Sequence, residues 1–81
     1  MNMEKISLTP MALVSWMVTK SKLGGSGVSL ALGKERRYIY SYTNKKHMPT
    51  IPLLTQIAKV CGYEVHIIGH GEDITVEVPE E

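Results

Sequence analysis

The chain has 81 residues, a formal net charge of +1 and a single cysteine, Cys61. This length allows one small domain and leaves little room for a buried catalytic cleft. A lone cysteine excludes an internal disulfide and favours a reducing compartment. The longest uncharged stretch, residues 6–19, is too short to cross a bilayer, and Glu4 and Pro10 disfavour a signal peptide. We therefore expect a cytoplasmic protein without membrane contact.

The charges are divided unevenly along the chain. Residues 1–48 contain eight lysines and arginines against two glutamates, a net charge of +6. Residues 49–81 contain one lysine against six acidic residues, a net charge of −5. This polarity suits the attraction of phosphate groups at one face, with an acidic end kept away from them. The same division of charge is also compatible with ordinary solvent-exposed surfaces that bind nothing.

The first predicted helix begins at Pro10, with Thr9 as its N-cap, and runs to about Ser21. It has almost no polar face, so we expect it to be buried more completely than an ordinary surface helix. A second helix is predicted over residues 27–32, after a glycine-rich break, with Ser26 as its N-cap.

A tight turn and a third helix, at residues 35–43, are predicted next. Gly33 suits the left-handed backbone of such a turn. The tyrosines of this segment alternate as in a strand, but Tyr38 and Tyr42 also stand four residues apart. The spacing from Gly33 favours the helix, and Asn44 is expected to be its left-handed C-cap.

The clearest helical pattern covers residues 51–61, capped by Thr50 and closed by Gly62. Its apolar residues form a single stripe, which predicts one buried face. We expect its polar side chains to face solvent: Thr55, Gln56 and Lys59.

The periodicity then changes from helical to alternating. Residues 64–68 and 74–78 are predicted strands, joined by a hairpin loop at residues 69–73. Because an isolated two-stranded hairpin is marginal in water, it needs either the helices or a second subunit, and we expect strand pairing across a dimer. The chain thus divides into a helical domain, residues 1–63, and a hairpin, residues 64–81, as a candidate dimerisation element.

The stretch from Val28 to Tyr42 has the spacing of a helix-turn-helix. Ser29 is small enough for one helix to pass over another, Gly33 can form the turn, and Ile39 can fill the angle between the helices. The expected fold is mainly α: a small four- to five-helix bundle with a helix-turn-helix, plus the C-terminal β-hairpin.

These residues resemble the Cro and phage-repressor type of helix-turn-helix regulators, the XRE-like family. The similarity covers about residues 9–65, including the loop at residues 44–50 and the helix after it. It implies a dimeric repressor of transcription that binds double-stranded DNA. Family members often begin the second helix with glutamine, where this chain has Gly25 or Ser26. The framework positions are occupied by Val28, Ser29, Leu32, Gly33, Ile39 and Tyr42.

The resemblance places the predicted helix 35–43 in the major groove of DNA. An arginine there can donate two parallel hydrogen bonds to guanine O6 and N7. The candidates for base contacts are Arg36, Arg37, Tyr40, Ser41 and Asn44. Lysines beside the helix and amides at a helix start suit phosphate groups. The candidates for phosphate contacts are Ser26, Lys34, Lys45, Lys46 and His47.

Other chemistry finds little support in the sequence. Cys61, His66 and His70 do not have the spacing of a closed four-ligand zinc site. No nucleophile elbow, phosphate loop or paired-carboxylate site is present, so we expect neither an enzyme nor a cofactor or metal. The alternative that stays open is a protein-interaction module on the same fold, either an antitoxin that binds a toxin or a small phage-type inhibitor.

Overall fold

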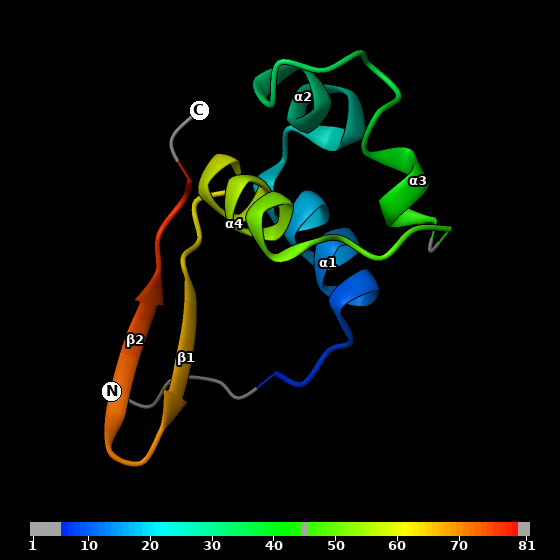
Figure 1. Cartoon of the computed structure of the whole chain (residues 1–81). Coiled ribbons are helices and arrows are strands. Elements are labelled where there is room, and N and C mark those ends of the chain that lie inside the picture. The colour runs from blue at the N-terminus through cyan, green and yellow to red at the C-terminus, as the bar shows by residue number, and fades with distance from the viewer. Residues whose placement is uncertain (1–5, 45, 80–81) are drawn as a thin grey trace.

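The computed structural model describes residues 6–44 and 46–79. Over these residues it contains four α-helices and one two-stranded antiparallel sheet, in agreement with a mainly α fold that carries a C-terminal hairpin. The helices form a body from which the hairpin extends, on the side away from α3 (Figure 1). The elements are α1 (Pro10–Ser21), α2 (Gly24–Ala31), α3 (Tyr40–Thr43), α4 (Ile51–Val60), β1 (Val65–Gly69) and β2 (Glu72–Val76).

Helix α1 is the central element of the body and has the predicted bounds. The Thr9 hydroxyl accepts a hydrogen bond from the amide of Ala12 at 3.2 Å, and Pro10 occupies the first turn, where no amide is needed. Helix α1 contacts α2, α3 and α4, which explains why so few polar residues occur in it. The core that it organises consists of Val14, Met17, Val18, Val28, Ile39, Leu53, Ile57 and Ala58.

Helix α2 begins earlier than the sequence predicts. It starts at Gly24, so Ser26 lies inside the helix and the prediction of Ser26 as N-cap is wrong. Gly24 and Gly25, which the sequence predicts to be part of a chain break, are the first two residues of this helix. A Cβ atom at Gly25 would lie 2.5 Å from Cε1 of Tyr40, so this position has no room for a side chain while the tyrosine ring lies over it.

Helix α3 is much shorter than the predicted helix 35–43, and the first half of that prediction is wrong. Residues 35–40 form successive turns. The amide of Tyr38 donates a hydrogen bond to the carbonyl of Glu35, and the amide of Tyr40 donates to the carbonyl of Arg37, both at 3.1 Å. The amide of Ile39 donates to the Ser29 hydroxyl at 3.0 Å. An α-helix would direct that amide to the Glu35 carbonyl, so the side-chain bond replaces the helical one.

The end of α3 also differs from its prediction. Asn44 has φ −89° and ψ 9°, so it is not a left-handed cap. Its side-chain oxygen accepts a hydrogen bond from the amide of Lys46 at 3.3 Å, a local turn typical of asparagine. The carbonyl of Ser41 accepts hydrogen bonds from the amides of Lys46 and His47, at 3.1 and 3.0 Å, and these bonds close the end of the helix.

Helix α4 has the predicted start. The Thr50 hydroxyl accepts from the amide of Leu53 at 3.3 Å, and the helix runs to Val60. The prediction that Thr55 faces solvent is wrong, because this residue is only 2% exposed. Its hydroxyl donates to the carbonyl of Pro52 at 2.7 Å, which satisfies the polar atom inside the helix. Contact between α4 and β1 covers this second side of α4.

The hairpin is formed within one chain, and its loop is shorter than predicted. The register pairs Val65 with Val76 and Gly69 with Glu72, so the expected five-residue loop at 69–73 is wrong. A two-residue turn connects the strands, with φ of +50° at His70 and +75° at Gly71. Two positive φ angles in succession are the pattern of a type I′ turn, whose twist matches that of the strands.

Candidate nucleic-acid interface

A single buried hydroxyl organises the α2–α3 corner, which we define as residues 24–43. The Oγ atom of Ser29 accepts from the amide of Ile39 at 3.0 Å and donates to the carbonyl of Gly25 at 2.8 Å. The Ser29 carbonyl accepts from the amide of Lys34 at 3.0 Å, just after Gly33 turns the chain with φ +76°. Ser29 therefore connects α2, the turn and the approach to α3.

Ile39 closes the corner from the inside. Its side chain is fully buried, as expected for a residue that fills the angle between two helices. It belongs to the same apolar cluster as Val14 of α1 and Ile57 of α4, so the corner is fixed to the rest of the body. Of its two neighbours in sequence, Tyr40 is exposed, whereas Tyr38 packs against the same cluster.

Exposed cations precede and follow α3. Arg36 and Arg37 lie in the turns before the helix, and Lys46 lies directly after it. Within residues 6–44 and 46–79, the ion pairs all involve His66, so these three cations have no acidic partner there. Lys34 is also exposed, with its Nζ 5.5 Å from the centre of the Tyr38 ring. The predicted phosphate ligand Lys45 lies outside the described residues.

Tyr40 connects α3 to the start of α2. Its side chain is 44% exposed, its ring lies over Gly25, and its hydroxyl is 3.5 Å from the Oγ atom of Ser26. A candidate base contact and a candidate phosphate contact are therefore neighbours. The contact between Tyr40 and Gly25 was not predictable from spacing; the available signal was a glycine where the XRE-like regulators, which this chain resembles, often have glutamine.

The remaining candidates are less free to reach a ligand. Ser41 is half-buried and its hydroxyl donates to the carbonyl of Tyr38 at 3.3 Å. Asn44 is exposed, but its side-chain oxygen is used in the local turn described above. The exposed His47 lies with its ring 6.0 Å from that of Tyr42.

Tyr38 and Tyr42 are packing residues. Their ring centres are 5.7 Å apart, and both pack against the core cluster. The neighbouring Tyr38 side chain, followed by burial, raises the pKa of Tyr42 above its ordinary value. Tyr42 therefore stays neutral at physiological pH, and its ring supports the underside of α3.

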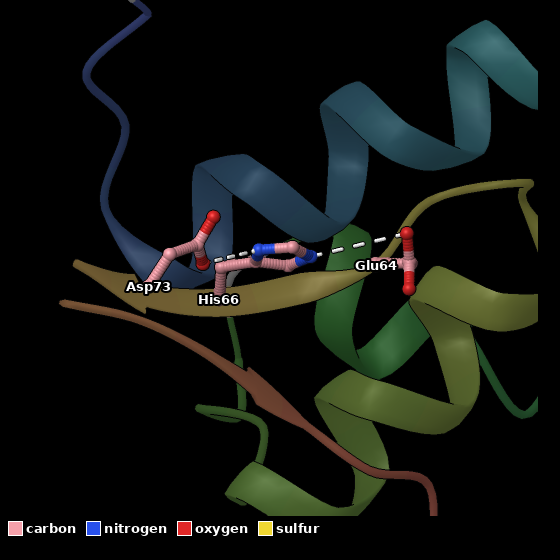
Figure 2. Close-up of polar contacts among 3 residues, drawn as sticks. All are labelled: Glu64, His66 and Asp73. Atoms are coloured by element: carbon pink, nitrogen blue, oxygen red, sulfur yellow. Dashed lines mark hydrogen bonds and ion pairs between the residues drawn. The ribbon is translucent and has the colours of Figure 1, made fainter.

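A separate polar cluster lies on the hairpin (Figure 2). Nδ1 of His66 is 2.6 Å from Oδ1 of Asp73 on the other strand, and Nε2 is 3.9 Å from Oε1 of Glu64. Within the described ranges, no group of three His, Cys, Asp or Glu side chains could hold a metal ion. No helix in this part of the chain is long and apolar enough to span a membrane.

Comparison with protein-family models, curated proteins and solved structures finds no match for this chain. The α2–α3 corner and the charges around it are therefore the features that point to a function. That surface contains exposed cations on both sides of α3 and a tyrosine that contacts the start of α2.

Proposed function

We propose that the protein is a sequence-specific regulator of transcription that binds double-stranded DNA with its α2–α3 corner, used as a helix-turn-helix. In this proposal two copies bind a two-fold operator in the cytoplasm and repress by occupying it. The function needs neither a cofactor nor a catalytic step. The resemblance of residues 9–65 to the Cro and phage-repressor type supports the same conclusion.

One observation carries this proposal: Arg36, Arg37 and Lys46 are exposed around α3 without acidic partners in the described part of the chain. Cations that are not neutralised internally are available to phosphate oxygens and base edges. The strand β2, which contains Glu72 and Asp73, extends from the helical body on the side away from α3 (Figure 1), so these two residues do not offset this charge locally.

Because α3 is short, the candidate DNA contacts lie on different local structures and have different roles in this proposal. Arg36 and Arg37 project from the turns that lead into α3, so they meet the groove from its edge. In this proposal Tyr40, the first residue of α3, which lies against the start of α2, contacts a thymine methyl or a phosphate. Lys46 suits a phosphate, since it follows the helix and lies outside the corner.

Binding of a random-sequence duplex at low salt tests the proposal. We expect affinity to fall steeply with salt, because each neutralised phosphate releases counterions. Lys46→Ala should reduce the slope of log affinity against log salt by about 1, for all sequences alike. Arg36→Ala should instead weaken a selected operator by roughly 5- to 150-fold and relax the preference at one base pair.

Lys20→Ala is the matched control for both variants, because it also removes one positive charge. Lys20 lies at the end of α1, with its Nζ 5.7 Å from the centre of the Trp16 ring. We expect this variant to bind like the wild type. Absence of binding by the wild type at low salt, or equal losses in all three variants, would contradict the proposed function.

A protein-interaction module is the second candidate, favoured by the exposed apolar side chains of the hairpin. Ile67, Ile68 and Ile74 are 60%, 76% and 53% exposed. Exposed apolar clusters mark binding surfaces for proteins more often than for DNA. A toxin-like partner would use this surface, and a DNA-binding antitoxin would use both surfaces.

A further inference from the structure

Helix α4 and the base of the hairpin lie next to each other and enclose a groove of about 500 Å³ (Figure 1). Sites for small molecules have volumes of about 300–1,000 Å³. One wall of this groove is formed by three half-buried valines, Val65, Val76 and Val78. Tyr63 extends the wall, and Trp16 holds its ring, with 5.3 Å between the ring centres. A short carbon chain can lie against this preformed wall.

Three charged side chains line the same groove: Lys59, Glu64 and Glu77. All three are exposed, and no ion pair between described residues joins Lys59 to either carboxylate. Two negative charges against one positive charge give the lining a net charge of −1. These three groups are therefore available to a ligand of opposite charge pattern.

The two carboxylates of the groove come from facing positions of the hairpin. Val65 pairs with Val76, so Glu64 and Glu77 occupy the next pair of positions in the register. Like charges at facing positions repel each other and destabilise a strand pair. The carboxylate of Glu64 has one distant partner, Nε2 of His66 at 3.9 Å. A cationic ligand at these two carboxylates would offset their repulsion.

We propose that the groove between α4 and the hairpin binds a free basic amino acid, of which lysine is the simplest example. The two cationic groups of the ligand lie at Glu64 and Glu77, its carboxylate lies at Lys59, and its aliphatic chain lies along the valine wall. The ligand charge of +1 then balances the −1 of the groove. A ligand with a single cationic group leaves one glutamate unpaired, and a ligand without a carboxylate leaves Lys59 unpaired. This site is independent of the proposed binding of DNA.

The exposure of the charged groups sets the expected strength of binding. An ion pair between exposed groups raises affinity by up to about fivefold. For a ligand of about ten non-hydrogen atoms we therefore expect a dissociation constant in the millimolar range. The ligand contacts both α4 and the hairpin, so it should stabilise the folded chain. At a free concentration of about ten times the dissociation constant, the folding equilibrium constant should rise about 11-fold.

An NMR titration of the full chain at constant ionic strength tests the site with three ligands. Lysine carries all three charged groups, norleucine lacks the side-chain cation, and cadaverine lacks the carboxylate. With lysine we expect saturable shifts of the backbone amides of Lys59, Val65 and Val76. Norleucine and cadaverine should each bind about fivefold more weakly, because each loses one ion pair. Absence of saturable shifts with lysine up to about 100 mM, or equal affinity for all three ligands, would overturn the inference.

Two variants, each lacking one charge, test the individual contacts. Lys59→Gln should abolish the preference for lysine over cadaverine, and Glu77→Gln should abolish the preference for lysine over norleucine. Glu72→Gln and Lys46→Gln are the matched controls, because they remove one charge of each sign outside the groove. Both controls should bind lysine like the wild type. Equal losses of affinity in all four variants, or preferences that persist in Lys59→Gln and Glu77→Gln, would overturn the inference.

Discussion

The α2–α3 corner and the hairpin use similar residues in opposite ways. In the corner, Ile39 is fully buried and its amide is bonded by the buried hydroxyl of Ser29. In the hairpin, Ile67 and Ile68 are mostly exposed, and the side-chain bonds lie at the surface. The apolar side chain of the corner is therefore packed within the chain, whereas those near the tip of the hairpin are left largely exposed. Stability and association should be separable by mutation.

The largest effect is expected for Ile39→Ala. Removal of a fully buried isoleucine side chain leaves a cavity next to Val14 and Ile57, and should lower the free energy of unfolding by about 2–5 kcal/mol. In a domain of this size that loss is a large part of the total stability. Urea denaturation followed by circular dichroism measures it.

Ile68→Ala is the control for this comparison. The same atoms are removed from a side chain that is 76% exposed, so we expect a change within about 0.5 kcal/mol. If both variants lowered the free energy of unfolding equally, the corner would not contribute more to stability than the hairpin.

The next effect is expected for Ser29→Ala. The variant keeps the small volume that the crossing requires but leaves the buried amide of Ile39 without its acceptor. We expect the free energy of unfolding to fall by about 1–3 kcal/mol. Hydrogen exchange at the Ile39 amide should accelerate more than exchange elsewhere.

Ser26→Ala provides the matched substitution on the same helix. Its hydroxyl makes only a long contact of 3.5 Å with the Tyr40 hydroxyl, so its loss should change stability by a few tenths of a kcal/mol. A Ser29→Ala variant as stable as Ser26→Ala would show that the corner does not depend on the buried bond.

The features that follow from local rules were predictable from the sequence. Thr9 and Thr50 are caps, Pro10 starts a helix, and Gly33 has a positive φ, because each depends on a few neighbouring residues. The burial of Ile39 followed from its spacing to Gly33. The paired strands were predicted by alternation, although their turn was placed too broadly.

The errors arose where distant residues decide the local structure. The short α3 reflects capture of the Ile39 amide by Ser29, ten positions away, and no helical propensity reports this bond. The close approach of the Tyr40 ring to Gly25 likewise brings together residues that are distant in the sequence. Thr55 is buried because the hairpin covers α4, and its hydroxyl is satisfied locally. The predicted helix 35–43 was too long, and for this reason two of the candidate base contacts, Arg36 and Arg37, lie in turns and not on a helix.

A smaller and opposite effect is expected for Gly25→Ala. Alanine is favoured over glycine in a helix by about 1 kcal/mol, but its Cβ would lie 2.5 Å from the Tyr40 ring. The ring is the far end of a flexible side chain, so we expect it to move away while stability rises by up to about 1 kcal/mol. The chemical shifts of Tyr40 and DNA affinity measure the displacement.

Tyr40→Leu combined with Gly25→Ala separates the two parts of this prediction. Without the ring, the alanine should give its full helical gain, and DNA affinity should not fall further than in Tyr40→Leu alone. A Gly25→Ala variant that binds DNA like the wild type, with Tyr40 displaced, would remove this tyrosine from the proposed interface.

The smallest effect concerns the junction between the two regions, where Cys61 follows α4. Burial raises the pKa of the Cys61 thiol, and the Ser21 side chain partly offsets this increase. Above the ordinary thiol pKa of about 8.5, the unfolded chain then loses its proton before the native chain does. The native state binds more protons in that range, so stability is complete below about pH 8.5 and falls as pH rises further. Cys61→Ala should make stability less dependent on pH between about 8 and 9.5, measured by urea denaturation under reducing conditions. An unchanged slope in Cys61→Ala would mean that the junction is open to water, and that the hairpin is less firmly attached to α4 than the corner is to α1.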